Sequence, residues 1–314
     1  MNILKVLSLM ECISGNEIGK LLGISRVVVR EQINKLKHIG YTIKSSSKGY
    51  TLIKSGKLFN KYEIELNIKK HLNICKIIKY YKELDSTQIT VKKLAEKNFE
   101  EGIVVVAEKQ NKSYGRVKRV WDSNYGGLWF SMLLKPAIRP DESSKLALLL
   151  SIALNRVLEK KYKINSEIKW PNDVLVCGRK IAGIIIEMSA EQDIINWVVA
   201  GIGVNINNSL PKYLKDTAIS LRKILNIEID RAQFLSEFLI EFEDLYFDFQ
   251  KNGFKRFLEE YNNKIAHKDK SVIVDSGHSI IIGKNLGIDT NGMLIVKTEN
   301  KLEHIISGTV RLLS

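Results

Sequence analysis

The chain has 314 residues, which is more than one ordinary domain needs and suits two or three domains. It is 45% hydrophobic and 27% charged, a composition typical of a globular protein. We find no apolar run of about 18 residues or more that could cross a bilayer, so we expect no membrane association. The opening residues have helically spaced apolar side chains and no cleavage site, which predicts a helix and not an export signal.

The net charge of +14 is unevenly distributed along the chain. Residues 1–62 hold eleven basic and three acidic residues, a net charge of +8. More than half of the excess charge therefore lies in the first fifth of the chain, which indicates a polyanionic partner for the N-terminus. A lysine-rich composition throughout the chain is the alternative explanation.

Cys12, Cys75 and Cys177 are far apart and lack the paired spacing of a zinc site. An odd number of scattered cysteines argues against a disulfide framework. We therefore expect buried thiols in a reducing cytoplasm.

Three short helical patterns open the chain, and a β-hairpin over residues 41–52 follows them. Gly23 separates the second pattern from the third, and Ser25 is a good N-cap for the third. The three apolar stripes are Ile3, Leu7 and Met10; Ile18, Leu21 and Leu22; and Val29, Ile33 and Leu36. This order predicts a helix-turn-helix with a hairpin wing whose turn covers residues 45–49.

The third helix would present a polar face, in which arginine can read guanine and asparagine can read adenine in a major groove. A three-helix interaction domain with a solvated basic face is the alternative. The basic excess and the hairpin favour DNA binding, with the wing tip reaching phosphate or minor groove. The predicted DNA-contacting residues are Ser25, Arg26, Val27, Arg30, Asn34 and Lys48.

The middle of the chain mixes strands and helices. Several predicted strands follow one another without a helix between them, which favours an α+β mixed sheet over a doubly wound fold. Residues 271–312 alternate around glycines, as a small β-barrel would. The predicted strands cover 103–107, 128–134, 167–170, 180–188 and 197–206, and the helices 142–161 and 230–250. With seams at 55–62 and 262–270, the predicted domains are 1–62, 63–265 and 266–314.

Polar motifs recur at the strand ends of the middle region. Taken singly, Ser86 and Thr87 could simply cap a helix, and residues 110–121 could be a mobile surface loop. Glycines inside an apolar strand are costly unless something approaches the backbone closely. The other motifs are Lys169-Trp170-Pro171-Asn172-Asp173, Lys180-Ile181-Ala182-Gly183 and Gly201-Ile202-Gly203-Val204-Asn205. Several such sites in one domain indicate a ligand-binding centre.

Lys-Trp-Pro-Asn-Asp, then Lys-x-Ala-Gly-Ile with a downstream Glu187, then Gly-x-Gly-x-Asn, in this order, resemble the bacterial biotin protein ligases. The N-terminal winged helix and the C-terminal barrel, which is of the SH3-like type in that family, extend the resemblance over nearly the whole chain. The arrangement is similar to the bifunctional members that also repress the biotin operon. The closing strand is also similar, with Thr309 where a glutamate is usual.

The resemblance implies a biotin–[biotin carboxyl-carrier protein] ligase that uses biotin, ATP and Mg²⁺. Such an enzyme forms biotinyl-5′-AMP and transfers biotin to a lysine of a biotin carboxyl carrier protein. The repressor half implies operator DNA as a partner and a homodimer in the adenylate-bound state.

The resemblance also implies a role for each matched residue. Arg116 and Lys180 would be catalytic, and Asp173 would bind the metal. Biotin would contact Ser86, Thr87, Gln88, Gln110, Tyr114, Gly115, Arg116, Lys180, Gly183 and Gly203. ATP and the adenylate would contact Arg116, Arg119, Trp121, Asn172, Asp173, Lys180 and Asn205, with Trp121 covering the adenine.

The residue types suit this chemistry, because a carboxylate attacking a phosphate needs cations to offset the repulsion between two anions. The loop departs from the family pattern: Ser113, Tyr114 and Lys118 stand where glycine, arginine and glycine are expected. Two alternatives remain. A lipoate-type acyl-adenylate ligase would not be expected to carry the N-terminal module, and intact Lys180 and Arg116 argue against a non-catalytic biotin sensor.

Overall fold

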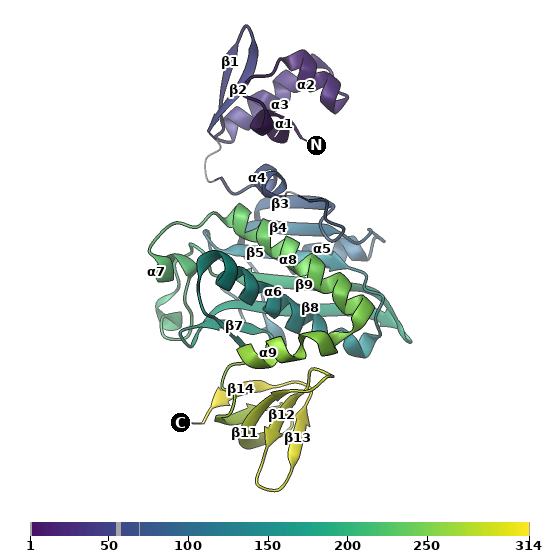
Figure 1. The fold of residues 1–314 in the computed structure, drawn as a ribbon, viewed down its shortest axis with the longest axis vertical. Coiled ribbons are helices and arrows are strands. Elements are labelled where there is room, and N and C mark those ends of the chain that lie inside the picture. Colours follow the sequence, from purple (N-terminus) through teal and green to yellow (C-terminus); the bar gives the residue numbers. More distant parts are fainter. Residues whose placement is uncertain (1, 55–57, 69, 314) are drawn as a thin grey trace. The chain divides into compact units, whose positions relative to one another are not determined.

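The computed structural model describes residues 2–54, 58–68 and 70–313. The chain divides into two compact units, Met1–Lys69 and Lys70–Ser314, which are described separately (Figure 1). The domain boundaries drawn from the sequence stay predictions, and residues 55–57 of the first predicted seam lie outside the described residues.

The first unit is the predicted helix-turn-helix with a hairpin wing. Ser14 and Glu17 form a reciprocal capping box at the start of the second helix, and Ser25 caps the third helix by accepting from the Val28 amide. Gly23 ends the second helix with a left-handed backbone, φ 66°. The elements are α1 (Ile3–Leu9), α2 (Gly15–Leu22), α3 (Arg26–His38), β1 (Thr42–Ser46), β2 (Gly49–Lys54) and α4 (Lys61–Asn67).

The apolar stripes form the core of this unit, with two exceptions. Met10 is 51% exposed, because α1 ends at Leu9 and Met10 follows in extended backbone. Leu21 is 53% exposed, because α2 turns Ile18 inward and leaves Leu21 on the outer side. The wing strands also run further than predicted, so that Ser47 and Lys48 alone lie between them.

The second unit is built on a seven-stranded sheet of order β3-β4-β5-β9-β8-β7-β6. β3 pairs with β4 in parallel and the other neighbours are antiparallel, which confirms the mixed sheet. The five predicted strands are present, while β3 and the four-residue β7 were not in the predicted set. Their bounds are β3 (Ile77–Leu84), β4 (Ile103–Gln110), β5 (Leu128–Leu134), β6 (Glu167–Lys169), β7 (Asp173–Val176), β8 (Arg179–Glu191) and β9 (Ile194–Val204).

Two long helices lie across one face of this sheet (Figure 1). They correspond to the two predicted helices, although the first begins at Lys145 because Pro140–Glu142 forms a 3-10 turn. The helices of this unit are α5 (Thr87–Ala95), α6 (Lys145–Tyr162), α7 (Leu221–Leu225), α8 (Arg231–Asn252) and α9 (Leu258–Lys264).

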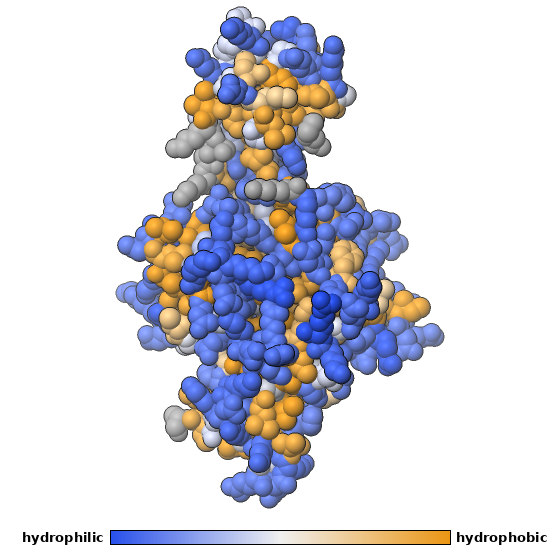
Figure 2. Space-filling view, in the orientation of Figure 1, coloured by the Kyte–Doolittle hydropathy of each residue, from blue (hydrophilic) through white to orange (hydrophobic). Residues whose placement is uncertain are grey.

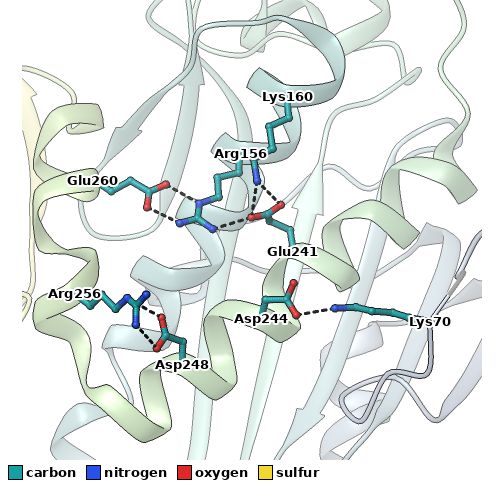
Figure 3. A network of polar contacts seen from close by, with 8 residues as sticks. All are labelled: Lys70, Arg156, Lys160, Glu241, Asp244, Asp248, Arg256 and Glu260. Atoms are coloured by element: carbon teal, nitrogen blue, oxygen red, sulfur yellow. Dashed lines mark hydrogen bonds and ion pairs between the residues drawn. The ribbon is translucent and has the colours of Figure 1, made fainter.

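Arg156 of α6 connects three of these helices (Figure 3). Its guanidinium donates to both carboxylate oxygens of Glu260 on α9 at 2.7 Å and to Glu241 on α8 at 2.8 Å. Lys160, one turn further along α6, also pairs with Glu241. A bidentate arginine with a second carboxylate is the strong form of such a contact, so this network fixes α9, from which the C-terminal module continues.

The C-terminal module, predicted as a small β-barrel, is a five-stranded antiparallel sheet. Its order is β13-β12-β11-β10-β14, and β14 pairs with β10. Val272, Val274, Val296 and Val310 fill its inner side. The strands are β10 (Ser271–Asp275), β11 (Ile280–Ile288), β12 (Leu294–Lys297), β13 (Leu302–Ile305) and β14 (Thr309–Leu312).

The face shown in Figure 2 is mostly hydrophilic where it covers the second unit, with hydrophobic residues scattered among the charges. Within the described part of the chain, no helix has the length and apolar character needed to cross a membrane. The expectation of buried thiols is right for Cys75 and wrong for Cys12 and Cys177, which are exposed. Cys177 is exposed because it occupies the tight turn between β7 and β8.

Candidate active site

A cavity of about 510 Å³ lies within the Lys70–Ser314 unit. Its walls are the start of α5, the loop that follows β4, the β6–β7 turn, the adjoining parts of β8 and β9, and the start of β14. Every residue to which the sequence assigned biotin or adenylate contacts lines this cavity. The structure therefore brings the scattered motifs together, while their individual roles stay predictions.

Hydroxyl and amide groups from α5 form one part of the wall. Ser86, Thr87 and Gln88 are 2%, 3% and 4% exposed, although they begin a helix next to a loop. The ordinary interpretation of Ser86 as a helix cap is correct, because its hydroxyl accepts from the Ile89 amide at 3.4 Å. The same helix start also faces the cavity, so capping and ligand contact do not exclude each other.

These groups belong to one buried hydrogen-bond network. The Thr87 amide and hydroxyl donate to Gln110 Oε1 at 2.7 and 3.1 Å, and the Thr87 and Ser131 hydroxyls share a hydrogen bond of 2.8 Å. Ser131 donates to Gln88 Oε1 at 3.1 Å, and Gln88 Nε2 donates to the carbonyl of Val199. Buried polar groups paired in this way can bind a neutral ligand group that both donates and accepts.

Cations form another part of the wall. Lys180 of β8 pairs with Asp173 of β7, Nζ to Oδ1, at 2.7 Å. The two residues come together because β7 and β8 are neighbouring antiparallel strands. Burial lowers the pKa of Lys169, and the nearby charges of Lys180 and Arg311 lower it further, against the opposing effect of Asp173. Positive charge is therefore concentrated in a partly buried space, which suits a polyanionic ligand.

The loop of residues 111–120 closes on itself and then reaches across the cavity. The Ser113 hydroxyl donates to the carbonyl of Trp121 at 2.6 Å, so both ends of the loop are joined. Arg116 donates to Asn172 Oδ1 at 3.1 Å and to the hydroxyl of Ser307, in the C-terminal module, at 2.7 Å. Burial lowers the pKa of Arg116. This loop, for which a mobile surface loop was the alternative interpretation, is a wall of the site that contacts two other segments.

The indole of Trp121 packs against the backbone of two glycines, Gly183 and Gly203. A Cβ placed on Gly203 would lie 2.6 Å from Trp121 Nε1, and one on Gly183 would lie 3.0 Å from Trp121 Cζ3. Lys180 Nζ lies 4.8 Å from the centre of the indole, within the range of a cation–π contact. Gly183 and Gly203, which the resemblance implies as biotin contacts, leave room for the indole in this structure.

Asn172 and Asn205 are held in place by their neighbours. Asn172 lies in the β6–β7 turn, which contains the cis Trp170–Pro171 bond, and its Nδ2 donates to the carbonyl of Ile184 at 2.7 Å. Asn205 is 4% exposed, and its Oδ1 accepts from Asn208 Nδ2 at 3.0 Å. The turn after β6 thus holds Asn172 against β8.

Several cavity residues had no role in the sequence analysis, among them residues of β5 and of the segment 210–218. Lys169 was part of a quoted motif and received no assignment, although a lysine between a strand and a tryptophan was a usable signal. His267 and the segment 308–310 also line the cavity. Nothing in the sequence indicates that these C-terminal residues meet a loop that lies about 190 positions earlier.

The predicted DNA-contacting residues lie on the outside of the first unit. Arg26, Arg30 and Asn34 are exposed on α3, opposite its buried residues Val29 and Ile33. Val27 is 68% exposed on the same outer side, Ser25 caps the helix, and Lys48 is exposed in the wing turn. This placement agrees with the predicted face, and its contact with DNA stays a prediction.

Three family profiles match successive parts of the chain. The HTH domain matches residues 1–51, the Biotin/lipoate A/B protein ligase family matches residues 80–205, and the Biotin protein ligase C terminal domain matches residues 267–313. Among solved structures, the biotin protein ligase of Aquifex aeolicus in complex with biotin and ATP matches with a TM-score of 0.68 and 32% identity. That match covers 76% of this chain and 99% of the other.

The similarity to curated relatives runs through nearly the whole chain. The bifunctional ligase/repressor BirA of Bacillus subtilis is 37% identical over 310 residues, covering 96% of this chain and 94% of that protein. The protein of the same name from Escherichia coli is 26% identical over 306 residues, with 96% and 93% covered. The chain therefore belongs to the biotin protein ligase family, and within it to the bifunctional ligase/repressors of the BirA type.

Proposed function

We propose that this ligase forms biotinyl-5′-AMP in the described cavity and transfers the biotin to a lysine of a biotin carboxyl carrier protein. We further propose that the adenylate-bound protein dimerises and represses transcription from operator DNA in the cytoplasm. The observation that carries the enzymatic proposal is the combination, in one cavity, of a buried hydroxyl–amide network with partly buried cations.

The first part of the cavity suits the uncharged end of biotin. A ureido group has two N–H donors and one carbonyl acceptor, and the network around Thr87, Gln110 and Ser131 offers hydroxyls and amides that can take either role. A site that can form such hydrogen bonds favours a ligand that offers both donors and an acceptor over one that lacks them. Lipoate has no ureido group and should bind poorly.

The cationic part suits the transfer of an adenylyl group. When the biotin carboxylate attacks the α-phosphate of ATP, a bond forms from carboxylate oxygen to phosphorus and pyrophosphate leaves. Lys180, Arg116 and Arg119 would offset the repulsion and stabilise the charge of the transition state. An acceptor lysine then attacks the carbonyl carbon of the anhydride and AMP leaves. The loop of residues 111–120 would keep water away from the anhydride in the meantime.

Magnesium would enter this site as the complex with ATP. Mg²⁺ is commonly held by one or two carboxylates together with substrate phosphates. Asp173 is a carboxylate of the cavity wall, and it is already paired with Lys180. The described residues include no group of three His, Cys, Asp or Glu side chains able to hold a metal by themselves. Binding through ATP therefore fits this chain better than a resident metal site.

The repressor role needs a link between ligand and DNA binding. A single winged helix makes few base contacts, so specific binding calls for two copies on paired half-sites. The adenylate is the natural effector, because it accumulates only when the acceptor is exhausted, and it contacts the loop of residues 111–120. A ligand shifts such an equilibrium only through different contacts in the two states.

The test of the enzymatic proposal is the exchange of labelled pyrophosphate into ATP in the presence of biotin, compared with lipoate. Exchange with biotin alone supports the proposal, and exchange with lipoate alone identifies the other type of ligase. For the repressor half, sedimentation and operator binding should be measured with and without biotin and ATP. A dimer equally populated in both states, with unchanged DNA affinity, would remove the regulatory half of the proposal.

A further inference from the structure

The side chain of Tyr114 connects the loop of residues 111–120 to the central sheet. Its hydroxyl donates to Glu187 Oε2, on β8, at 3.0 Å. The other carboxylate oxygen of Glu187 accepts from Lys92 Nζ, on α5, at 3.1 Å. A single carboxylate therefore joins the loop, the sheet and the helix that begins with the hydroxyl–amide wall of the cavity.

This contact is a charge-assisted hydrogen bond, because an O–H group donates to a carboxylate. Its surroundings are partly exposed, since the side chains of Lys92 and Glu187 are 33% and 28% exposed. Burial, followed by the charge of Glu187, raises the pKa of Tyr114 to about 12. The phenol therefore keeps its proton, and remains a donor, throughout the physiological pH range.

Apart from the contacts of Arg116 with Asn172 and Ser307, the tip of the loop has little packing to hold it in place. Val117 and Val120 are 86% and 84% exposed, so they contribute almost no packing. Val117 and Lys118 both have φ near 54°, a left-handed conformation that costs energy in residues other than glycine. The position of the tip must therefore be set by contacts at the base of the loop, where Tyr114 also pairs with Val120 through a backbone bridge.

Tyr114 stands two residues before Arg116, which reaches Asn172 and Ser307 across the cavity. If the base of the loop moved away from β8, Arg116 would lose its alignment with both partners. Trp121, at the other end of the loop, would lose its place against Gly203 for the same reason. The hydroxyl of Tyr114 thus acts on the reacting groups through other residues, and it need not touch the ligand to do so.

We propose that Tyr114 is a positioning residue, whose hydrogen bond to Glu187 holds the loop over the cavity and slows the escape of the adenylate. This inference rests on the proposed adenylate chemistry. The family pattern has an arginine at the position of Tyr114, so the hydroxyl has a role particular to this chain. Glu187, which does not line the cavity, would be the residue that anchors the loop.

The test is the dissociation rate of preformed biotinyl-5′-AMP from the full chain, chased with excess unlabelled biotin. Tyr114→Phe removes the hydroxyl and keeps the ring. We expect dissociation to become about three- to tenfold faster, the range for losing one ordinary hydrogen bond, because this pair is partly exposed. Tyr125→Phe is the matched control, because the Tyr125 hydroxyl also donates to a carboxylate, that of Glu83, away from the cavity lining. Its dissociation rate should equal that of the wild type.

A second variant separates positioning from a general structural effect. Glu187→Ala should speed dissociation as Tyr114→Phe does, and the double variant should be no faster than Glu187→Ala alone, because both changes remove the same bond. The KM for biotin and the dissociation rate should rise, while kcat for adenylate formation at saturating substrate changes less. Fully multiplied effects in the double variant, or a wild-type dissociation rate for Tyr114→Phe, would overturn the proposal.

Trypsin cleavage within residues 112–119 gives a readout that needs no chemistry. In the ligand-free protein this cleavage should be faster for Tyr114→Phe than for the wild type and for Tyr125→Phe. If the wild type forms no adenylate, the proposed function fails, and the cleavage rates still decide whether Tyr114 anchors the loop. Equal cleavage rates in all three proteins would contradict the anchoring.

Discussion

The indole of Trp121 lies so close to the backbone of Gly203 that a Cβ at this position would be 2.6 Å from Nε1. Gly203 pairs with Gly183 across β8 and β9, so two adjacent strands present bare backbone to the same ring. The Nε1 group is buried and has no hydrogen-bond partner among the described residues. The ring is thus packed against strand backbone and carries a buried donor without a partner, which is unusual in a folded protein.

Gly203→Ala should therefore displace Trp121 from the cavity wall. Because a contact of 2.6 Å cannot be relieved without a shift, we expect weaker binding of ATP and of the adenylate, with a smaller effect on biotin alone. Isothermal titration with each ligand measures the difference, and the melting temperature without ligand is the control for folding. Unchanged nucleotide affinity in a folded variant would show that Trp121 does not cover the nucleotide.

Lys180→Ala should slow the formation of the adenylate itself. Losing one preorganised donor to a developing charge typically costs about 10² to 10³ in rate. The assay is biotin-dependent pyrophosphate exchange. Lys70→Ala is the matched control, because Lys70 also pairs with an aspartate at 2.7 Å, on the exposed surface (Figure 3). A Lys180→Ala enzyme as active as the control would remove Lys180 from the chemistry.

Arg116→Gly should have a different effect, in which the adenylate forms but is released. Arg116 connects the loop to Asn172 and Ser307, so its loss should open the cavity while Lys180 remains. Free adenylate would then label lysines of bystander proteins, which mass spectrometry detects. Arg256→Gly, at a surface arginine paired with Asp248, should label the acceptor only. Bystander labelling at the wild-type level in Arg116→Gly would show that the loop is placed wrongly.

Arg30→Ala and Lys48→Ala should weaken DNA binding in different ways. Arg30 is exposed on α3, and a lost base contact there should cost about 1–3 kcal/mol at one operator position. Lys48 lies at the wing turn, and a lost phosphate contact should lower the salt slope by about 1 for all sequences. Fluorescence anisotropy at several salt concentrations separates these effects. Equal effects on specific and random DNA for both variants would contradict base reading by α3.

ATP binding should be accompanied by proton uptake at alkaline pH. Burial lowers the pKa of Lys169, assisted by Lys180 and Arg311, and a bound polyphosphate would counter that positive charge and raise the pKa again. Without ligand, the unfolded chain binds this proton more tightly than the folded chain does. Lys169 therefore makes the folding stability rise with pH between its lowered pKa and the ordinary lysine pKa. Titration calorimetry in buffers of different ionisation enthalpy measures the uptake. Lys169→Met should abolish it, and an unchanged uptake in this variant would assign the proton elsewhere.

Much of this architecture could be predicted because the local signals agree with one another. The third helix is an example: its apolar stripe is Val29, Ile33 and Leu36, with Ser25 before it and Gly40 after it. These local signals predict the same helix that the tertiary packing requires. Strand β5 was predicted with its observed bounds, since it is an apolar run, interrupted only by Ser131, that is buried on both faces. Met10 and Leu21 were assigned wrongly because the hydrophobic character of a side chain does not decide which side of a short helix is covered.

The cavity was predictable as a set of motifs but not as a geometry. Gly183 and Gly203 were identified because glycine is unfavourable in strands, yet which group fills the space depends on the path of a distant loop. Arg116 contacts Ser307, and Tyr114 bonds to Glu187, although these partners are far apart in the chain. A single sequence carries no covariation that could indicate such pairs. Such partners follow from the assembled sheet and cannot be obtained from spacing.

The most direct test of the account is intact-mass analysis of a biotin carboxyl carrier protein incubated with the purified chain, biotin and MgATP. A lipoyl carrier domain incubated with lipoate serves as the parallel reaction. We predict the addition of one biotin to one lysine of the biotin carrier, dependent on ATP and lost in Lys180→Ala, with no modification of the lipoyl domain. An unmodified biotin carrier, or modification of the lipoyl domain instead, would contradict the account.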